Sequence, residues 1–569
     1  MGKHKVVCWD TETSGLDLHT ICRPFCFTLC YENQEPLYWL WEVDPLTRMP
    51  IVSDADIKEI ESYFEDADEI IGQNQKFDIR AASTVGIKWQ PHWWDKVQDT
   101  LYSGHLLGSG QPHDLNSQAL IHLGIDISQY EQRLKKACNE ARAIARRDYP
   151  DWLIAKEDNP DLPSAKGESL ASWDYWLPRE IARAKKYPPG HPWWDVLTEY
   201  ACIDPAVTLP LWLKHKELLE ERGLWKVYLE RRKLIKIIYD MESRGVTYNQ
   251  TRLEEMRTRF KAESAEDERI CLEISGLDKL PKSGTSKAMR KLLFEDWKLP
   301  PLKRSKKTNE PSVDRATLKT WADSQPALSK PARFITCLLS KRQKDTACAY
   351  MESYKRFGQP WKGDYRILHP SLNATGTRTL RFSSQNPNES NISKQDGVNL
   401  RYAFGPAMGR EWWSLDFKNL ELVLPAWESG EQVMIDLFLK ADEPPYFGSY
   451  HLLNASIIYK REFDECLARG EKFKDKYKAT LYQWVKNFGF AVQYGAMEES
   501  GTADRAAHKP GAQAMVAKNL TKLEALNKRC IEFANANGYI ETMPDKEAGS
   551  YPLQVPYGWG NRVKPTVPL

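Results

Sequence analysis

Two carboxylates near the N-terminus have a spacing that favours a divalent cation. Asp10 and Glu12 follow the strand-like segment from Val6 to Trp9, and side chains two residues apart in a strand lie on one face. Neighbouring carboxylates repel each other, and both stay ionised only beside a cation. Magnesium and manganese prefer such oxygen ligands. Because an isolated Asp-x-Glu is more often a solvated turn, the interpretation needs further residues.

Two later segments add polar side chains of the same kind. A short apolar strand from Ile70 runs into Asn74-x-x-Phe77-Asp78. Further along, Tyr200 and Asp204 lie in a helical stretch, where residues four apart project from one face. These segments supply two more carboxylates and a hydroxyl.

The three segments, in this order, resemble the motifs of the DEDDy 3′–5′ exonucleases of the proofreading type, over roughly residues 1–215. The resemblance implies an RNase H-like α/β domain with two magnesium or manganese ions. Two ions about 3.5–4 Å apart stabilise both oxygens of an in-line phosphodiester displacement. Tyr200 would orient the attacking water, while Asn74 and Phe77 would hold the 3′ end or the local fold. The implied metal ligands are Asp10, Glu12, Asp78 and Asp204, with Asp10 bridging the ions.

A different chemistry is indicated in the second half of the chain. Lys486, Phe490 and Tyr494 follow one another at steps of four, which places a cation and two aromatic rings on one helix face. That layout has the size of a nucleotide, whereas an amphipathic core stripe would not need the lysine. The residues from Trp412 to Asp416 are read as a buried strand that ends in an aspartate.

These segments resemble motifs B and A of the family A DNA polymerases, and Met241 to Val246 resembles the entry into the polymerase body. The resemblance implies that Asp416 binds both metals of a second active site. Glu421 falls at the steric gate against a ribose 2′-hydroxyl, which implies selection of deoxynucleotides. His451 would reach the triphosphate of the nucleotide, with a satisfied core histidine as the alternative.

Other residues are assigned to contacts with DNA. Arg381 and Asn388 belong to segments that resemble the family's cradle for the primer–template minor groove, and Arg381 would contact the primer end. A basic loop suits contact with the phosphate backbone, although a solvated loop has the same composition. Its residues are Lys303, Arg304, Lys306 and Lys307.

Three positions depart from the polymerase pattern. Val423 replaces an arginine, and Ser449 replaces an aspartate before His451. The family has an arginine one turn before the motif B lysine, where this chain has Tyr482. Lys478 lies another turn back and is the sequence's candidate for the missing charge.

The length of 569 residues allows three to five domains, at roughly 100–200 residues each. We expect an α/β fold, in which an RNase H-like exonuclease domain precedes a right-hand polymerase body of palm, thumb and fingers. The segment from about 131 to 191 is an insertion with basic residues and tryptophans. It either grips single-stranded DNA or forms a solvated helix face over a satellite core. The predicted domains are the exonuclease (1–215), connecting helix and thumb (216–360), palm (361–455) and fingers (456–569).

Composition excludes several other classes of protein. With 41% hydrophobic and 28% charged residues, the chain is neither disordered nor a membrane bundle. It lacks an apolar run of about 18 residues and a signal peptide. The net charge of +2 excludes a bulk-basic binder but leaves room for local basic surfaces. Eleven scattered cysteines fit a reducing, cytoplasmic compartment.

The expected function is DNA-templated synthesis from a primer and deoxynucleoside triphosphates, with two magnesium ions at each site and 3′–5′ proofreading. By analogy, the absence of a 5′ nuclease segment points to a phage-type enzyme. The His-Asp-Glu of motif C does not occur, so we expect the C-terminal part of the palm to come from a longer product or a second chain. Two alternatives remain: an exonuclease with an incomplete polymerase half, and the DNA-binding half of a split polymerase.

Overall fold

The chain forms two compact units, Met1–Trp412 (the N-terminal unit) and Trp413–Leu569 (the C-terminal unit). Among the described residues, no helix is both long and apolar enough to cross a membrane. The predicted site residues Lys306, Lys307 and Tyr494 lie outside the described residues. The computed structural model describes the whole chain except residues 1–4, 21, 33, 156–167, 170–173, 282–286, 305–308, 325, 327, 379, 391, 396, 408, 479, 494–495, 497–500, 538, 542–553 and 557–569.

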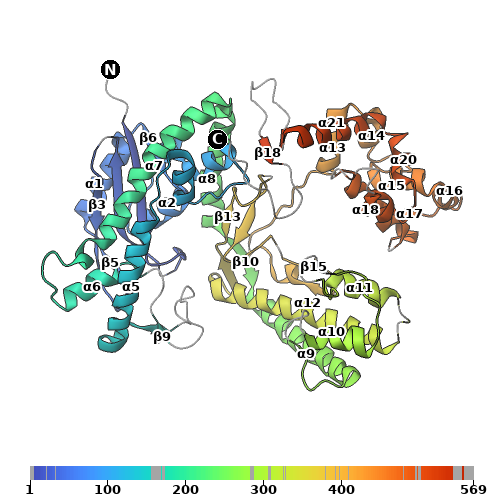
Figure 1. The fold of residues 1–569 in the computed structure, drawn as a ribbon, viewed down its shortest axis with the longest axis horizontal. Helices are drawn as coiled ribbons and strands as arrows, with labels where there is room; N and C mark the ends of the chain where they lie inside the picture. Colours follow the sequence, from blue (N-terminus) through green and yellow to red (C-terminus); the bar gives the residue numbers. More distant parts are fainter. Residues whose placement is uncertain are drawn as a thin grey trace. The chain divides into compact units, whose positions relative to one another are not determined.

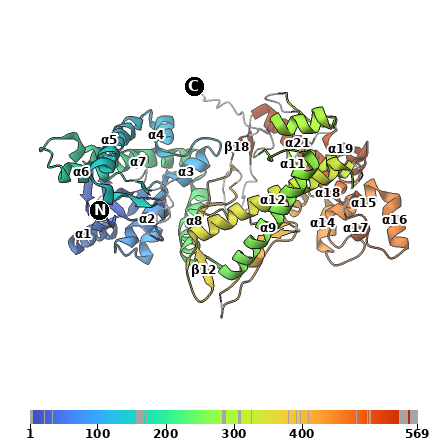
Figure 2. The same ribbon diagram turned by 90° about the horizontal axis from the view of Figure 1, so that it is seen from below.

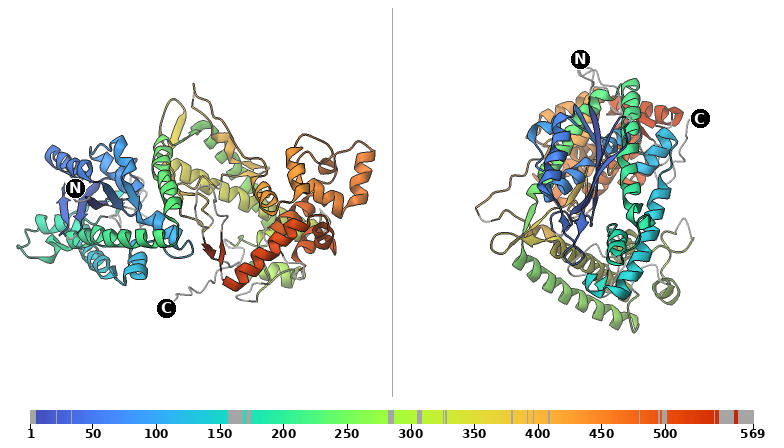
Figure 3. Two further views of the ribbon diagram at one scale, coloured as in Figure 1. Left: turned by 90° about the horizontal axis from the view of Figure 1, so that it is seen from above. Right: turned by 90° about the vertical axis from the view of Figure 1, so that its left-hand side faces the viewer.

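A five-stranded sheet organises the first part of the N-terminal unit (Figure 3). Its central strand β1 pairs antiparallel with β2 and parallel with β6, and β6 pairs parallel with β7. The predicted strand at Val6 is confirmed, but it runs on to Thr13 and therefore includes Asp10 and Glu12. In spatial order the strands are β3 (Leu37–Leu40), β2 (Pro24–Tyr31), β1 (Val6–Thr13), β6 (Glu69–Gly72) and β7 (Val97–Asp99).

Helices cover both faces of this sheet. The Trp9 ring stacks on Phe27 with centroids 5.1 Å apart and meets Phe64 of α1 (Asp54–Asp66) edge-on at 5.0 Å. Its indole also donates to Gln75 of α2 (Gln75–Thr84). Because successive strand residues point to opposite faces, Asp10 faces the other side, where α7 (Val196–Glu221) packs.

One predicted helix is two helices in the structure. Apolar residues at three- and four-residue steps from Leu213 to Arg244 predict one helix that ends at Gly245. In the structure α7 ends at Glu221 and α8 spans Trp225–Arg244. Gly223 between them has a left-handed φ of 64°. The Trp225 ring packs against Trp212 of α7 at 6.1 Å, so apolar contacts continue across the break. The periodicity therefore predicts helical structure correctly but misses the break, and two of its apolar residues, Ile237 and Met241, are exposed.

The predicted end of α8 at Gly245 is confirmed. Gly245 has φ 65°, and a Cβ there would lie 2.5 Å from the Leu368 carbonyl oxygen, so only glycine fits. The chain then enters β10 (Val246–Asn249), which pairs antiparallel with β12 (Tyr365–Leu368). Two long helices, α9 (Gln250–Ser275) and α12 (Lys330–Phe357), lie side by side (Figure 2).

The remaining elements of the N-terminal unit are shorter. In chain order the strands are β4 (Glu42–Val43), β5 (Pro50–Ile51), β8 (Ile154–Ala155), β9 (Glu168–Ser169), β11 (Gln359–Pro360), β13 (Ser371–Asn373), β14 (Ser383–Gln385), β15 (Lys394–Gln395) and β16 (Val398–Asn399). The helices are α3 (Thr100–Leu107), α4 (Leu115–Leu123), α5 (Ser128–Asp148), α6 (Leu177–Ala184), α10 (Lys287–Arg290) and α11 (Arg315–Ser324). Short 3₁₀ or π turns lie at Pro91–Asp95, Pro150–Trp152, Pro192–Trp194, Lys291–Asp296 and Leu400–Ala403.

A buried ion pair ties α2 to α8. The Lys76 ammonium donates to Glu242 Oε1 at 2.5 Å and to the Leu372 carbonyl at 2.6 Å. The same Glu242 oxygen accepts from the Leu372 amide at 2.7 Å. Both side chains are about nine-tenths buried. One carboxylate thus joins the second predicted motif to α8 and to β13.

Replacing Glu242 with alanine should destabilise the protein by about 3–5 kcal/mol, because it leaves a buried ammonium without its partner. Urea unfolding measures the loss. The matched control is Lys236→Ala on the same helix, whose ion pair with Asp240 is exposed and worth about 0.3–0.5 kcal/mol. Equal losses in the two variants would contradict the expected role of burial.

Four histidines gather where α3, α4 and α7 pack. The rings of His105 and His113 meet edge-on at 5.0 Å, and those of His122 and His215 at 4.6 Å. His105 and His215 are fully buried. Burial, and then the neighbouring histidines, lower the pKa of His215 to about 3 and that of His105 to about 4. Both rings are therefore neutral when the protein is folded at pH 7.

This arrangement predicts a loss of stability in mild acid. In the unfolded chain a histidine titrates near 6.5, so between pH 6.5 and about 4 only the unfolded state takes up these protons. The stability is complete above pH 6.5 and falls by about 2 kcal/mol for each ring at pH 5. The His215→Gln variant should therefore gain about that much on the wild type between pH 7 and 5 in urea unfolding. Parallel curves for the variant and the wild type would contradict this.

The C-terminal unit is mainly helical around one apolar core, which includes Tyr450, Val485 and Phe488. Within this unit, α15 (Tyr450–Ile458) packs against α18 (Leu481–Gln493) (Figure 1). The C-terminal unit has further helices and short strands. Its helices are α13 (Leu420–Ser429), α14 (Gln432–Leu439), α15 (Tyr450–Ile458), α16 (Lys460–Ala468), α17 (Phe473–Lys476), α18 (Leu481–Gln493), α19 (Thr502–Ala507), α20 (Ala512–Ala517) and α21 (Thr521–Asn537); the strands are β17 (Tyr539–Glu541) and β18 (Gln554–Pro556).

The predicted buried strand before Asp416 is wrong in this structure. Residues 411–417 form no strand, and the side chains of Trp413 and Leu415 are 84% and 93% exposed. A strand needs a hydrogen-bonded neighbour, and no described strand pairs with this segment. Asp416 therefore lies in an exposed irregular segment that leads into α13.

Candidate active sites

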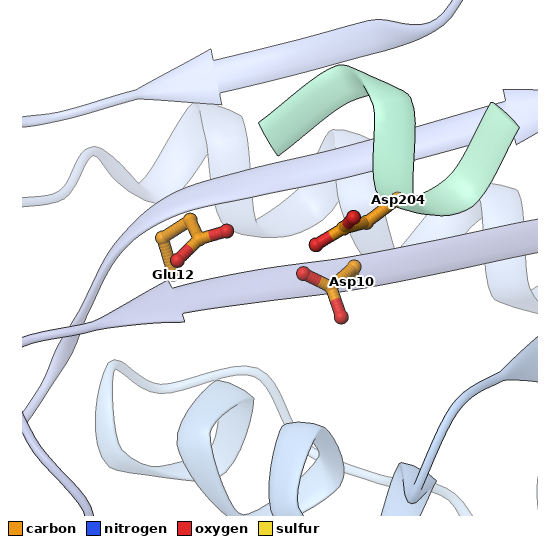
Figure 4. A group of neighbouring side chains, drawn as sticks. All are labelled: Asp10, Glu12 and Asp204. Atoms are coloured by element: carbon orange, nitrogen blue, oxygen red, sulfur yellow. The ribbon is translucent and has the colours of Figure 1, made fainter. Parts of the chain in front are cut away.

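Three of the four predicted metal-binding carboxylates meet on one face of the sheet (Figure 4). Asp10 and Glu12 project from β1, and Asp204 projects from α7. One oxygen from each of these side chains lies within 4.8 Å of the others. The alternation of the strand and the packing of α7 on β1 together produce the cluster.

Burial and crowding make this cluster electrostatically unfavourable without a cation. Burial raises the pKa of Asp10 well above its usual range, and Asp204 raises it further. Burial also raises the pKa of Glu12, with a further rise from Asp10. Burial, and then the charges of Asp78 and Glu131, raise the pKa of Asp204 to about 7. Hard divalent cations bind oxygen ligands of this kind, so the donor set fits magnesium or manganese.

The fourth carboxylate is held apart by hydrogen bonds. Asp78 Oδ1 accepts from the Thr11 hydroxyl at 2.6 Å and from the Thr11 amide at 3.2 Å. Asp78 is nevertheless close enough for Asp10 to raise its pKa, after the larger effect of burial. Asp78 thus lies beside the three-carboxylate cluster, and Thr11 is a partner that sequence reasoning missed.

Asp99 is a second missed residue, and it shapes the Asn74 segment. This fully buried carboxylate accepts from the amides of Asn74 at 3.1 Å and Gln75 at 2.9 Å. Asn74 has a left-handed φ of 61°, and α2 begins at the next residue. Burial raises the pKa of Asp99 to about 6. The strand β7 that ends in Asp99 reads Val97-Gln98-Asp99, so no apolar run marked it in the sequence.

Tyr200 of α7 lies close to the carboxylate cluster. The negative charge of Glu12, then burial, raises the pKa of the Tyr200 hydroxyl above its usual range. This hydroxyl is therefore a neutral donor close to the cluster. The Tyr175 ring meets the Tyr200 ring edge-on, with the ring centroids 5.9 Å apart.

The insertion from 131 to 191 packs against this site and also contributes an acid. Leu134 and Trp176 are buried with Phe25 of β2 in one core cluster, which is the satellite core predicted as one alternative. Glu131 in α5 is close enough to raise the pKa of both Glu12 and Asp204. Its own carboxylate pairs with Lys135 at 2.5 Å. Sequence spacing gave no signal for this fifth carboxylate.

A second site lies in the C-terminal unit. Asp416, Glu421, His451 and Phe490 line one open cavity of about 400 Å³, between the start of α13 and the helices α15 and α18. The Lys486 ammonium lies 6.0 Å from the centre of the Phe490 ring. The structure therefore gathers five predicted nucleotide-site residues from three helices and the segment before α13.

Gly489 allows His451 to approach α18. A Cβ at Gly489 would lie 3.1 Å from His451 Nδ1, so the histidine ring occupies the space that a side chain would fill. The His451 ring also meets Phe490 edge-on at 5.6 Å. Burial, and then the charge of Lys486, lower the pKa of His451 to about 4, which leaves the ring neutral at pH 7.

The residues predicted to contact DNA lie in the N-terminal unit. Arg381 is exposed, and Asn388 accepts from the Ser384 hydroxyl at 3.2 Å. In the basic loop, Lys303 pairs with Asp314 at 3.2 Å and Arg304 donates to the Asn309 carbonyl at 2.9 Å. Two of the loop's charges thus have partners within the protein.

Comparison with known proteins places this chain in DNA polymerase family A. The sequence pattern of the family described as "DNA polymerase family A" matches residues 250–549, just over half of the chain. The chain therefore belongs to this family, and the expected polymerase resemblance is confirmed at that level.

Individual relatives are distant. The thermostable DNA polymerase I of Thermus aquaticus is 25% identical over 433 residues, which are 72% of this chain and 47% of that protein. DNA polymerase I of Treponema pallidum is 27% identical over 498 residues, 86% of this chain and 45% of that protein. The chain thus spans about half the length of these curated relatives.

A solved structure shares the fold. The POL domain of Pol1 from M. smegmatis, in complex with DNA primer-template and dNTP, matches with a TM-score of 0.65. The match covers 95% of this chain and 77% of that one, at 14% identity. It confirms the expected mixed α/β fold.

Proposed function

We propose that this chain carries two phosphoryl-transfer sites, one for DNA-templated synthesis and one for 3′–5′ removal of the primer end. Membership of DNA polymerase family A supports the first site. The observation that carries the second is the buried cluster of Asp10, Glu12 and Asp204. The sheet order, with β1 between an antiparallel and a parallel neighbour, suits the RNase H-like domain expected for residues 1–215.

At the exonuclease site we assign the cluster to binding of two magnesium or manganese ions. Such ions, when bound, activate water and stabilise the charge that develops on the displaced oxygen. Tyr200 presents a neutral hydroxyl that can hold the attacking water by a hydrogen bond. Asp78 and Glu131 add negative charge around the cluster, and this strengthens its preference for cations.

At the polymerase site we assign the cavity beside α18 to the incoming deoxynucleoside triphosphate. Lys486 would neutralise phosphate, Phe490 would stack on the base, and Asp416 would hold metal at the cavity's edge. Glu421 lines the same cavity, where it could exclude a 2′-hydroxyl. Arg381 and Asn388 are proposed to contact the primer–template duplex.

Primer extension and 3′ degradation, measured separately in magnesium and in manganese, test both assignments. We expect degradation of a single-stranded 3′ end by this chain alone. Extension is assayed on the chain alone and on a product lengthened by the downstream coding sequence. The longer product is included because the His-Asp-Glu of motif C does not occur in this sequence. Failure to degrade DNA in either metal would refute the exonuclease assignment. Failure of both proteins to extend a primer would refute the polymerase assignment.

A further inference from the structure

The proposed nucleotide pocket contains little positive charge. Lys486 is the only lysine that the described structure places against Phe490, and Tyr482, one helical turn earlier, is neutral where the family has arginine. His451 is buried and lies close to Lys486. A triphosphate carries several negative charges, so one lysine leaves much of that charge without a protein partner.

Lys478, the replacement predicted from sequence, is not on the same helix. The helix α18 begins at Leu481, and Lys478 lies before it with an exposed side chain. Counting back four residues from Tyr482 assumed one continuous helix. The helical face that carries Lys486 and Tyr482 therefore does not extend to Lys478.

A different lysine reaches the Tyr482 ring. The Lys474 ammonium lies 5.9 Å from the centre of that ring, while His451 meets the same ring edge-on at 6.4 Å. Lys474 belongs to α17, whose neighbouring Phe473 is buried against Phe463 with ring centroids 5.5 Å apart. Burial of Phe473 fixes the short helix α17 in place. The backbone position of the exposed Lys474 is thereby fixed as well.

Lys474 is also uncommitted within the described structure. Nearby Lys476 pairs with Glu471 at 2.5 Å, whereas the described residues give Lys474 no ion pair and no side-chain hydrogen bond. Its ammonium instead faces the aromatic ring of Tyr482. An ammonium on an exposed aromatic face is held weakly, and a phosphate oxygen is a stronger partner.

We propose that Lys474 supplies the second cation for the triphosphate of the incoming nucleotide, from α17 instead of from α18. Tyr482 positions its ammonium at the helix face that carries Lys486. This inference rests on the proposed nucleotide site. It makes phosphate binding depend on two helices of one apolar core, instead of on one helix.

Equilibrium binding of a deoxynucleoside triphosphate and of the matching monophosphate, in magnesium, tests this role. The full chain is titrated with each nucleotide and tryptophan fluorescence is followed. Lys474→Met should weaken triphosphate binding about tenfold and leave monophosphate binding unchanged, because only the outer phosphates reach this lysine. Lys474→Arg should retain affinity, and Lys478→Met is the matched control with no expected effect.

A combined variant separates charge from structure. Tyr482→Arg restores the family's charge on α18, so adding Lys474→Met to it should cost much less than tenfold. Unchanged triphosphate binding in Lys474→Met, or equal loss of both nucleotides, would overturn the role of Lys474. Absence of nucleotide binding by the wild type would instead overturn the proposed nucleotide site itself.

Discussion

The Asp10→Ala variant should lose 3′–5′ degradation by on the order of a thousandfold while it keeps its affinity for nucleotides. Two-metal stabilisation is worth several kcal/mol, and each 1.36 kcal/mol is a factor of ten in rate. Asp10 lies in the three-carboxylate cluster of the N-terminal unit and takes no part in the cavity beside α18. Gel-resolved shortening of a 5′-labelled single strand measures the loss.

The same variant has a second readout in the folded state. Removing one of three crowded, buried carboxylates relieves repulsion in the absence of metal, so Asp10→Ala should be at least as stable as the wild type in a chelator. Asp126→Ala is a control, since this carboxylate is exposed and accepts a hydrogen bond from the Ser128 amide at 2.9 Å. Full degradation by Asp10→Ala, or equal loss of nucleotide binding, would refute separate sites.

The Lys486→Ala variant should weaken binding of a deoxynucleoside triphosphate by about a hundredfold. A charge-assisted contact contributes about 1.5–3 kcal/mol, and 1.4 kcal/mol is a factor of ten in affinity. The variant also removes the cation beside the Phe490 ring. Fluorescence titration in magnesium measures the affinity, and 3′ degradation should be unchanged.

Gln483→Ala is the control for this prediction. Gln483 is exposed on the same helix and donates to Asn487 at 2.9 Å, away from the cavity. We expect it to bind nucleotide like the wild type and to show that the helix tolerates truncation. If Lys486→Ala also bound normally, the cavity beside α18 would not be the triphosphate site.

Local periodicity accounts for what the sequence predicted well. Asp10 and Glu12 share a face because strand side chains alternate, and Tyr200 and Asp204 share one because helix residues four apart are stacked. The glycine at 245 stops a helix by a property of its own backbone. Each of these inferences needs only residues close together in sequence, and the structure places them accordingly.

Features that depend on distant partners were missed or wrong. Asp99 holds the Asn74 segment, and Glu131 approaches the exonuclease cluster, through tertiary packing that no spacing in the sequence records. The segment before Asp416 has the composition of a strand, but pairing requires a neighbour that composition cannot supply. The helix break at Gly223 leaves no mark in the apolar periodicity, because the contacts of Trp225 continue that periodicity across the break.

The Lys76–Glu242 ion pair restricts movement inside the N-terminal unit. It joins the helix that carries Asp78 to α8, and its backbone contacts at Leu372 extend the link to β13. Rotation of the five-stranded sheet and α2 away from α8 and β13 would expose and break this buried ion pair, at a cost of about 3–5 kcal/mol. The carboxylate cluster of the candidate nuclease therefore keeps a fixed position relative to α8 and β13 within the N-terminal unit.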